Sequence, residues 1–238
     1  MDFQNTLKSL KVKVFLDGAD LDSIKEYASL DVIHGFTSNP SLMSQNNISN
    51  YEDFIINTLK LVNDKPVSFE VVEDENNLII EQAKRIANFS NNIFVKIPIV
   101  NTNGISCIPA IKELSKQGIP LNITAILTDL QAIEVIKAIP DPSNEIILSI
   151  FAGRIADTGI DPKTTFKEVI KAKSNISNYK TLWASPREIF NLYEANNVGA
   201  DIITITPQIL NKVKLFNKDL TTYSIETVQM FYKDAQKN

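Results

Sequence analysis

The stretch VSFEVVEDENNLIIEQAKRIANFSNNIFVKI, residues 67–97, holds one complete unit of the fold that the sequence predicts. It begins with a β-rich run at 67–72, continues through an amphipathic segment at 76–89 and ends with a second β-rich run at 93–97. Two strands joined by a crossover helix are expected to be parallel. The apolar residues of the middle segment share one stripe at helical spacing, and they are Leu78, Ile79, Ala83 and Ile86.

The same alternation of strand and helix continues along the rest of the chain. Most of the strand-like runs are bounded by Gly, Pro, Asn or Asp, which are typical of turns. Strands are expected at 12–17, 35–38, 67–72, 93–97, 121–126, 145–151, 179–184 and 200–205. Helices are expected at 20–29, 50–63, 76–89, 106–117, 129–138, 163–173, 187–197 and 207–216.

Eight strand–helix units within 238 residues predict a (β/α)8 TIM barrel that forms a single domain over residues 1–238. An open, doubly wound sheet is the alternative. The count of eight favours the barrel, and so does the absence of a glycine-rich first turn.

An additional C-terminal helix is expected at 221–236, after the eighth unit. Ile225, Val228 and Tyr232 form an apolar stripe along it at helical spacing, and such a stripe needs a partner surface. The helix packs either on the outside of its own barrel or on a neighbouring subunit. The second alternative predicts a homo-oligomer.

Composition excludes several classes of function. A net charge of -4 argues against a nucleic-acid-binding or anionic-membrane surface, and no run approaches the ~18 apolar residues of a membrane span. The single cysteine, Cys107, and the single histidine, His34, leave no intrachain disulfide and no Cys- or His-based metal site. We therefore expect no metal, and a chain with one reduced thiol is typical of the cytoplasm.

One lysine interrupts a strand that should be apolar. Barrel strands are buried on both faces, and active sites of such barrels lie at the C-terminal ends of the strands. Lys96 lies inside the run IFVKIP, where a buried ammonium is costly unless it is paired. A buried lysine is more readily neutral, and a neutral amine is the nucleophile of Schiff-base chemistry. The alternative is a structural lysine that reaches solvent or pairs with an acid.

Further polar residues lie near the ends of other predicted strands. Asp17 ends the first strand and Glu70 interrupts the third, and both could pair with Lys96 or move protons. Side chains alternate along a strand, so three pairs each share one face. These pairs are Asn122 with Thr124, Ser149 with Phe151, and Trp183 with Ser185.

Two of the three arginines follow adjacent predicted strands. Arg154 comes after the sixth strand and Arg187 after the seventh, with Ser185 near the predicted start of the next helix. Guanidinium groups, a hydroxyl and helix N-terminal amides together form a phosphate cradle. The alternative is that the arginines form ion pairs with loop acids such as Asp157 or Glu188.

Seven motifs in order along the chain resemble the strand-end signatures of transaldolases, in particular the short, single-barrel branch shared with fructose-6-phosphate aldolase. They cover the chain from about residue 12 to the C-terminal helix. The motifs are FLDGAD (15–20), GFTSNPSL (35–42), VSFEV (67–71), FVKIP (94–98), NITAI (122–126), SIFAGR (149–154) and ASPR (184–187).

This resemblance implies a class I aldolase mechanism without a metal or organic cofactor, acting on sugar phosphates of the pentose phosphate pathway. Lys96 would form the Schiff base, Glu70 would move protons through a water molecule, and Asp17 would handle the hydroxyl proton during C–C cleavage. The resemblance also implies roles in substrate or water binding for Asn39, Asn122, Thr124, Ser149, Phe151, Arg154, Ser185 and Arg187.

Two positions separate the branches of the family. Aldolases that release dihydroxyacetone carry Gln and Tyr where this chain has Glu70 and Phe151, so the resemblance favours transfer. Gly18, Pro186 and Glu188 depart from the family pattern, and Glu188 adds a negative charge beside the expected cradle. Release of dihydroxyacetone, a silent sugar-phosphate-binding barrel and a substrate with another anionic group are the alternatives.

Overall fold

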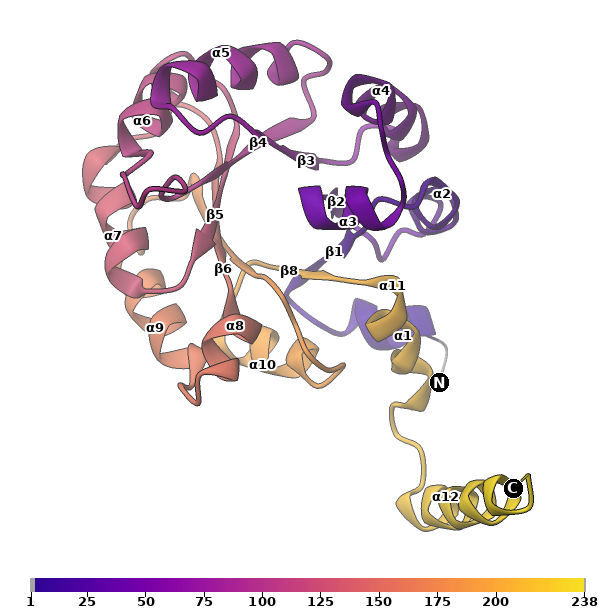
Figure 1. Ribbon diagram of the computed structural model, residues 1–238. Helices are drawn as coiled ribbons and strands as arrows, with labels where there is room; N and C mark the ends of the chain where they lie inside the picture. Colours follow the sequence, from indigo (N-terminus) through magenta and orange to yellow (C-terminus); the bar gives the residue numbers. More distant parts are fainter. Residues whose placement is uncertain (1–2, 238) are drawn as a thin grey trace.

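The computed structural model describes residues 3–237, and within them eight parallel strands close into a barrel (Figure 1). Each strand pairs with the next along the chain, and β8 pairs with β1. The predicted (β/α)8 barrel is therefore confirmed, and the open sheet is wrong. The strands are β1 Lys13–Asp17, β2 Gly35–Thr37, β3 Val67–Glu70, β4 Ile93–Pro98, β5 Leu121–Ile126, β6 Ile146–Ile150, β7 Tyr179–Trp183 and β8 Ile202–Ile205.

Helices surround the barrel (Figure 1). They are α1 Phe3–Lys8, α2 Leu21–Ala28, α3 Pro40–Gln45, α4 Tyr51–Val62, α5 Asn76–Ala87, α6 Ile108–Lys116, α7 Asp129–Ala138, α8 Ala152–Asp157, α9 Pro162–Ala172, α10 Asn191–Val198, α11 Pro207–Leu210, the 3-10 helix η1 Asn211–Leu215, and α12 Leu220–Ala235. In this part of the chain, no helix is both long and apolar enough to span a membrane.

The apolar stripe of α5 illustrates how the outer core forms. Ile79, Ala83 and Ile86 are buried and belong to the cluster between barrel and helices. Leu78, which the stripe also includes, is 38% exposed. The buried face of α5 is thus narrower than the sequence predicts.

A second apolar cluster fills the inside of the barrel. It consists of Phe15, Ile147, Leu182, Ala184 and Ile202, with Phe94 and Phe151 packed against it. Because side chains alternate along a strand, Phe15 shares its face with Asp17, and Phe94 shares its face with Lys96. This cluster therefore forms the layer beneath the polar end of the barrel.

Three elements differ from the sequence prediction in ways that affect the site. The short helices α3 and α8, six residues each, follow β2 and β6 directly and were not predicted. The helix expected at 187–197 begins only at Asn191. The side-chain Oδ1 of Asn191 accepts hydrogen bonds from the backbone N–H groups of Arg187 and Glu188, which holds the preceding residues in a turn.

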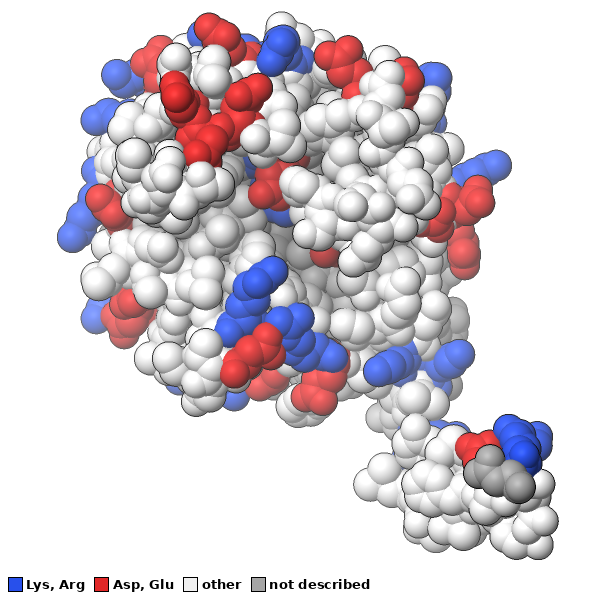
Figure 2. All heavy atoms as spheres, in the orientation of Figure 1, with Lys and Arg blue, Asp and Glu red and all other residues white. Residues whose placement is uncertain are grey.

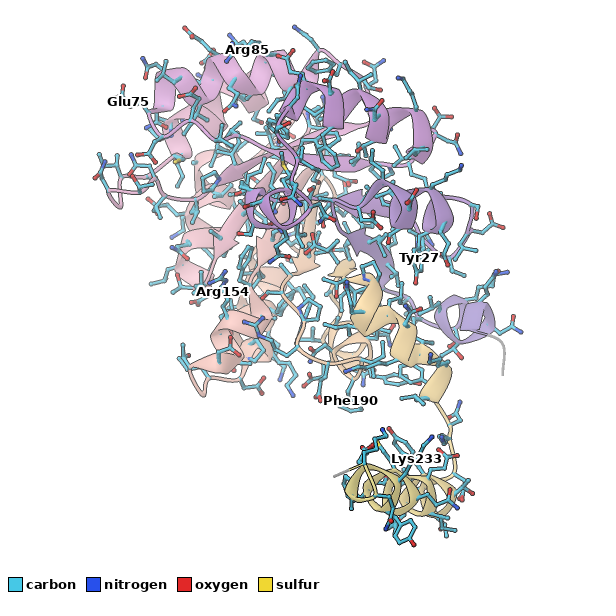
Figure 3. All side chains as sticks on the ribbon, turned by 45° about the vertical axis from the view of Figure 1, so that its right-hand side comes forward. Tyr27, Glu75, Arg85, Arg154, Phe190 and Lys233 are labelled. Carbon is cyan, nitrogen blue, oxygen red and sulfur yellow. The ribbon has the colours of Figure 1, made fainter. Side chains whose placement is uncertain are left out.

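The C-terminal helix α12 stands apart from the barrel (Figures 1 and 3). Figure 3 shows Lys233 on this separate helix, and none of the described residues of α12 is buried. The structure therefore does not show α12 packed on the outside of its own barrel, which is one of the two alternatives for the apolar stripe. Ile225, Val228 and Tyr232 are all exposed.

Candidate active site

A cavity of about 450 Å³ opens at the end of the barrel where the strands end. Figure 2 shows this face, with a hollow at its centre and basic and acidic side chains side by side over α8 at the rim. Nine residues that the sequence predicted for the site line the cavity. They are Asp17, Asn39, Glu70, Lys96, Thr124, Ser149, Phe151, Arg154 and Ser185.

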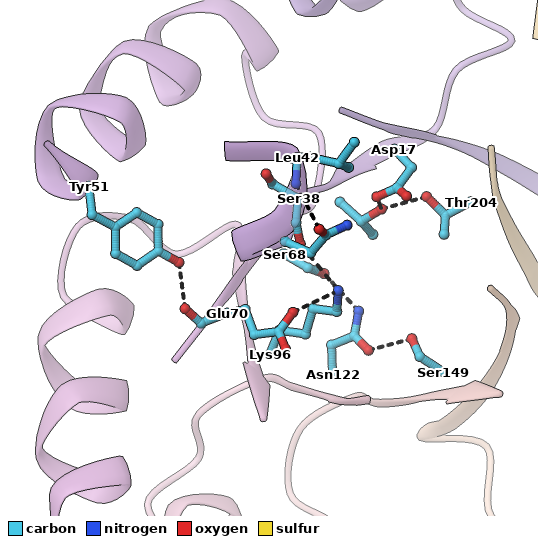
Figure 4. A network of polar contacts seen from close by, with 12 residues as sticks. Asp17, Ser38, Leu42, Tyr51, Ser68, Glu70, Lys96, Asn122, Ser149 and Thr204 are labelled. Atoms are coloured by element: carbon cyan, nitrogen blue, oxygen red, sulfur yellow. Dashed lines mark hydrogen bonds and ion pairs between the residues drawn. The ribbon is translucent and has the colours of Figure 1, made fainter. Parts of the chain in front are cut away.

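Lys96, on β4, is held by polar groups from the neighbouring strand β3 and from the residue that follows β2. Its side chain is only 7% exposed, and its Nζ lies 3.0 Å from Oε2 of Glu70. The same Nζ donates a hydrogen bond of 3.2 Å to the carbonyl oxygen of Ser38, which follows β2 (Figure 4). The ammonium is thus paired, and it lies directly beside a carboxylate that can accept its proton.

Asp17 faces the same cavity from the end of β1. Thr37 donates a hydrogen bond of 2.8 Å from its Oγ1 to Oδ1 of Asp17, and the Thr37 hydroxyl also contacts the Thr204 hydroxyl (Figure 4). Burial raises the pKa of Asp17, although the charge of Lys96 and the Thr37 hydrogen bond act in the opposite direction. A carboxyl group that takes up a proton more readily than usual suits proton transfer near neutral pH.

Asn122 lies beneath the cavity rather than in its lining, and it is fully buried. Its Nδ2 donates to Ser68 Oγ at 3.0 Å, and its Oδ1 accepts a 2.6 Å hydrogen bond from Ser149 Oγ (Figure 4). Ser149 does line the cavity. Asn122 therefore fixes the Ser149 hydroxyl in position.

Thr124 and Asn39 offer polar groups to the cavity. The buried Thr124 Oγ1 has no hydrogen-bond partner among the described residues, so it is available to a substrate or a water molecule. Asn39 caps α3, where its Oδ1 accepts from the Leu42 N–H at 3.0 Å. Its Nδ2 is the group that can donate to a substrate oxygen.

The two arginines at the rim differ. Arg154, on α8, lines the cavity, and its guanidinium lies over the Phe151 ring at 5.8 Å from the centroid. Arg187 forms a bidentate ion pair with Asp157 instead, with Nε 3.1 Å from Oδ1 and Nη2 in contact with Oδ2. The Arg187 hydrogen bond lowers the pKa of Asp157. For Arg187, the ion-pair alternative is thus the arrangement in the structure.

The loop after β7 does not supply the helix N-terminus that the phosphate cradle was expected to use. α10 begins at Asn191, six residues beyond Ser185. Ser185 itself adopts a left-handed backbone with φ of 60° and lines the cavity. Its carbonyl oxygen would lie 1.7 Å from a Cβ at position 153, so only Gly153 lets α8 approach this loop so closely.

Sequence reasoning missed several residues of the site. Thr37 and Thr204 occupy inward positions of β2 and β8, and the alternation rule applied to those strands would have found them. Ser38 contributes its backbone carbonyl oxygen to Lys96, and Ser68 contributes its hydroxyl group to Asn122. No sequence signal marks either contribution. The residues Pro40, Ser41 and Leu42 line the cavity because they form α3.

His34 and Cys107 lie outside this cavity. His34 precedes β2 and accepts a hydrogen bond at Nδ1 from the Val14 N–H. Cys107 is buried, and burial raises the pKa of its thiol. Across residues 3–237, no group of three His, Cys, Asp or Glu side chains could hold a metal ion.

Fold and site together define a TIM-barrel protein with a buried lysine that is paired with a carboxylate in its candidate active site. The family described as Transaldolase/Fructose-6-phosphate aldolase matches residues 14–238. Two relatives, each named "Probable transaldolase", come from Nitrosopumilus maritimus and Syntrophobacter fumaroxidans. They are 32% and 34% identical, and each match covers 95% of this chain and 96% or 97% of the relative.

The chain therefore belongs to the transaldolase/fructose-6-phosphate aldolase family. It is an enzyme of the transferase type that these relatives represent. Among solved structures, dihydrodipicolinate synthase from Rhodopseudomonas palustris has a TM-score of 0.56 at 11% identity, and the match covers 86% of this chain and 74% of that one. A structural similarity at such low sequence identity supports a shared barrel fold and nothing further.

Proposed function

We propose that the protein is a transaldolase that transfers a dihydroxyacetone unit from a ketose phosphate to an aldose phosphate through a Schiff base on Lys96. The observation that carries this proposal is the ion pair between the buried Lys96 and Glu70, which shares one cavity with the carboxyl group of Asp17. A nucleophilic amine needs a nearby base and a second group that can move a substrate proton. These three side chains supply that set.

The first half of the reaction forms the Schiff base. Glu70 takes a proton from the Lys96 ammonium, and the neutral Nζ then attacks the C2 carbonyl carbon of the ketose. Protonation of the resulting hydroxyl group and loss of one water molecule give the iminium ion. The Oγ1 of Thr124 and the Oγ of Ser149 can hold the water and the substrate hydroxyls at this stage.

The second half breaks and remakes a carbon–carbon bond. Asp17 accepts the proton of the C4 hydroxyl while the C3–C4 bond breaks, which releases an aldose and leaves a three-carbon enamine on Lys96. The enamine carbon then attacks the aldehyde carbon of the acceptor, and Asp17 returns the proton to the new hydroxyl group. Hydrolysis of the iminium ion releases the new ketose and restores the lysine.

The anionic end of the sugar is proposed to bind at the rim. Arg154 and Ser185 both line the cavity on the side of α8 and the loop after β7. A guanidinium and a hydroxyl can bind a phosphate group through charge-assisted hydrogen bonds. Arg187 joins them when a phosphate group displaces Asp157 from its guanidinium.

Incubation of the protein with fructose 6-phosphate, with and without erythrose 4-phosphate, tests the reaction type. Turnover that requires the acceptor supports the transaldolase. Turnover without the acceptor supports release of dihydroxyacetone instead, the alternative that Glu70 and Phe151 disfavour by their resemblance to the transferring branch. Absence of turnover under both conditions favours a silent sugar-phosphate-binding barrel or a different substrate.

We also propose that α12 packs on a second copy of the chain. Its exposed apolar side chains support this, because a helix with such a face is stable in water only when that face is covered. The exposed residues are Leu220, Tyr223, Ile225, Val228, Met230, Phe231 and Tyr232. We propose that the enzyme acts in the cytoplasm, in agreement with the free thiol of Cys107. We also propose that it acts in the pentose phosphate pathway, in agreement with the proposed substrates.

A further inference from the structure

A second cavity, of about 480 Å³, opens at the opposite end of the barrel, where the strands begin. Its apolar lining includes Phe15, Phe94, Ile147 and Ile202, which belong to the cluster inside the barrel. Phe15 precedes Asp17 by two residues on β1 and therefore lies on the same, inward face. The apolar layer thus separates this second cavity from the candidate active site.

Gly35 helps to keep this apolar layer in place. A Cβ atom at position 35 would lie 2.6 Å from the ring of Phe15, which is too close for any real contact. β2 therefore presents no side chain at this level of the barrel, and the Phe15 ring occupies the space. The Phe15 ring therefore closes the inner end of the cavity, where it is only 3% exposed.

The rim of this cavity carries an excess of positive charge. Lys11, Lys13 and Lys180 line it, and none of them forms an ion pair among the residues that the structure describes. Of the two acids in the lining, Asp201 is already paired with Lys173, with Nζ 2.9 Å from Oδ2. That leaves one carboxylate, Glu145, for three ammonium groups.

The strand register brings two of these lysines to the same side of the barrel. Lys13 on β1 pairs with Ile202 of β8, and Leu182 of β7 pairs with the same residue. Lys180 lies two residues before Leu182, so it occupies the same inward row of β7 at the level of the rim. Like charges gathered in this way repel one another, and a bound anion would relieve that repulsion.

We propose that this cavity binds a small amphipathic anion, with an aromatic or branched-alkyl body against Phe15, Phe94 and Ile202 and a carboxylate or phosphate group at Lys13 and Lys180. The volume lies in the range of small-molecule sites, which combine an apolar lining with a few placed polar groups. The site is distinct from the cavity of Lys96, because the apolar layer lies between them.

Calorimetric titration of the whole protein with 2-naphthoate tests the proposal, with uncharged 2-naphthalenemethanol as the matched probe. We expect saturable binding of the carboxylate and clearly weaker binding of the alcohol. The double variant Lys13→Gln/Lys180→Gln is expected to weaken 2-naphthoate binding about tenfold, since two charge-assisted contacts are lost. Lys112→Gln, which changes an exposed lysine on α6, is the control and should bind like the wild type.

The single histidine reports where the probe binds. His34 lines this cavity and is the only imidazole in the chain, so its proton resonances can be followed without assignment of the rest of the spectrum. We expect 2-naphthoate to shift these resonances along the same binding curve that calorimetry gives. A melting temperature of the Lys13→Gln/Lys180→Gln variant close to that of the wild type would show that this variant folds.

Three results would overturn the proposal. The first is the absence of saturable 2-naphthoate binding. The second is binding that the lysine variant leaves unchanged or that the neutral alcohol matches. The third is binding that Arg154→Gln abolishes without any shift at His34, which would assign the probe to the cavity of Lys96.

Discussion

Lys96 and Glu70 are partners in the strand register of β4 and β3, and their charged ends meet at 3.0 Å. The strand register therefore places the Glu70 carboxylate beside the Lys96 ammonium. Asp17 reaches the same cavity from β1, across the barrel, and its neighbour Thr37 holds one of its oxygens. The pairing accounts for a stable buried ammonium, and it also provides the base that a Schiff-base lysine needs.

Asp17→Asn should lower activity and raise stability. Proton transfer by a positioned side chain contributes about 100- to 10,000-fold, so kcat should fall by an amount in that range. Burial raises the pKa of Asp17 above its ordinary value of 3.8, which means that the folded protein binds this proton more tightly than the unfolded chain. Ionised Asp17 therefore destabilises the fold at neutral pH, and the amide removes that effect.

The pH dependence of the stability gain in Asp17→Asn tests whether the ionisation of Asp17 is its cause. Below the ordinary value of 3.8 the carboxyl group is protonated in both states, so the difference in melting temperature between Asp17→Asn and the wild type should vanish there. The difference should grow as the pH rises through the raised pKa. A stability gain of equal size at pH 3 and pH 7 would show that the ionisation of Asp17 is not its cause.

Replacement of Glu70 by Gln together with Phe151 by Tyr should shift the products from transfer toward release. The amide removes the carboxylate beside Lys96 Nζ, and the tyrosine adds a hydroxyl to the cavity that can activate a water molecule. The measurement is the ratio of transferred product to free dihydroxyacetone, with each single variant as a control. An unchanged ratio in the double variant would mean that these positions do not set the reaction type.

Arg154→Ala should weaken kcat/KM for a phosphorylated ketose by about 10- to 150-fold, because hydrogen bonds to charged groups contribute roughly 1.5–3 kcal/mol. Turnover of unphosphorylated dihydroxyacetone should hardly change. Asp157→Asn is the opposing variant: it frees Arg187 from its bidentate pair and should lower KM for the phosphorylated ketose. Equal losses with both donors in Arg154→Ala would argue against an anion site at this rim.

Truncation after Lys218 removes α12 and should reduce the oligomer size measured by light scattering. The expected cause is the loss of the apolar helix face, since none of the described residues of α12 is buried within the chain. The barrel contributes the active site, so the circular dichroism of the truncated protein should remain that of a folded α/β protein. A folded, truncated protein with the native mass would contradict packing across subunits.

The periodicity of the sequence predicts the barrel because its elements are regular. The eight strands follow from short β-rich runs, most of which are bounded by turn residues, and their observed bounds lie within or close to the predicted ranges. The helices α1, α3 and α8 have six residues each, which is too few for an amphipathic repeat to be recognised. Two of the three, α3 and α8, line the rim of the site.

The candidate site is predictable where a polar residue interrupts an apolar strand, as Lys96 and Glu70 do. The rest depends on three-dimensional arrangement. The pairing of Arg187 with Asp157 joins residues on different loops, and the sequence could offer it only as an alternative. The same holds for Asn122, whose neighbours Ser68 and Ser149 come from strands β3 and β6.

The most direct test of the central claim is borohydride trapping with a ketose phosphate, followed by peptide mass spectrometry. Reduction of the Schiff base should inactivate the enzyme irreversibly and add a reduced sugar fragment to Lys96 alone. Lys96→Ala should show neither activity nor labelling. Labelling of another lysine, together with full activity in Lys96→Ala, would contradict the mechanism.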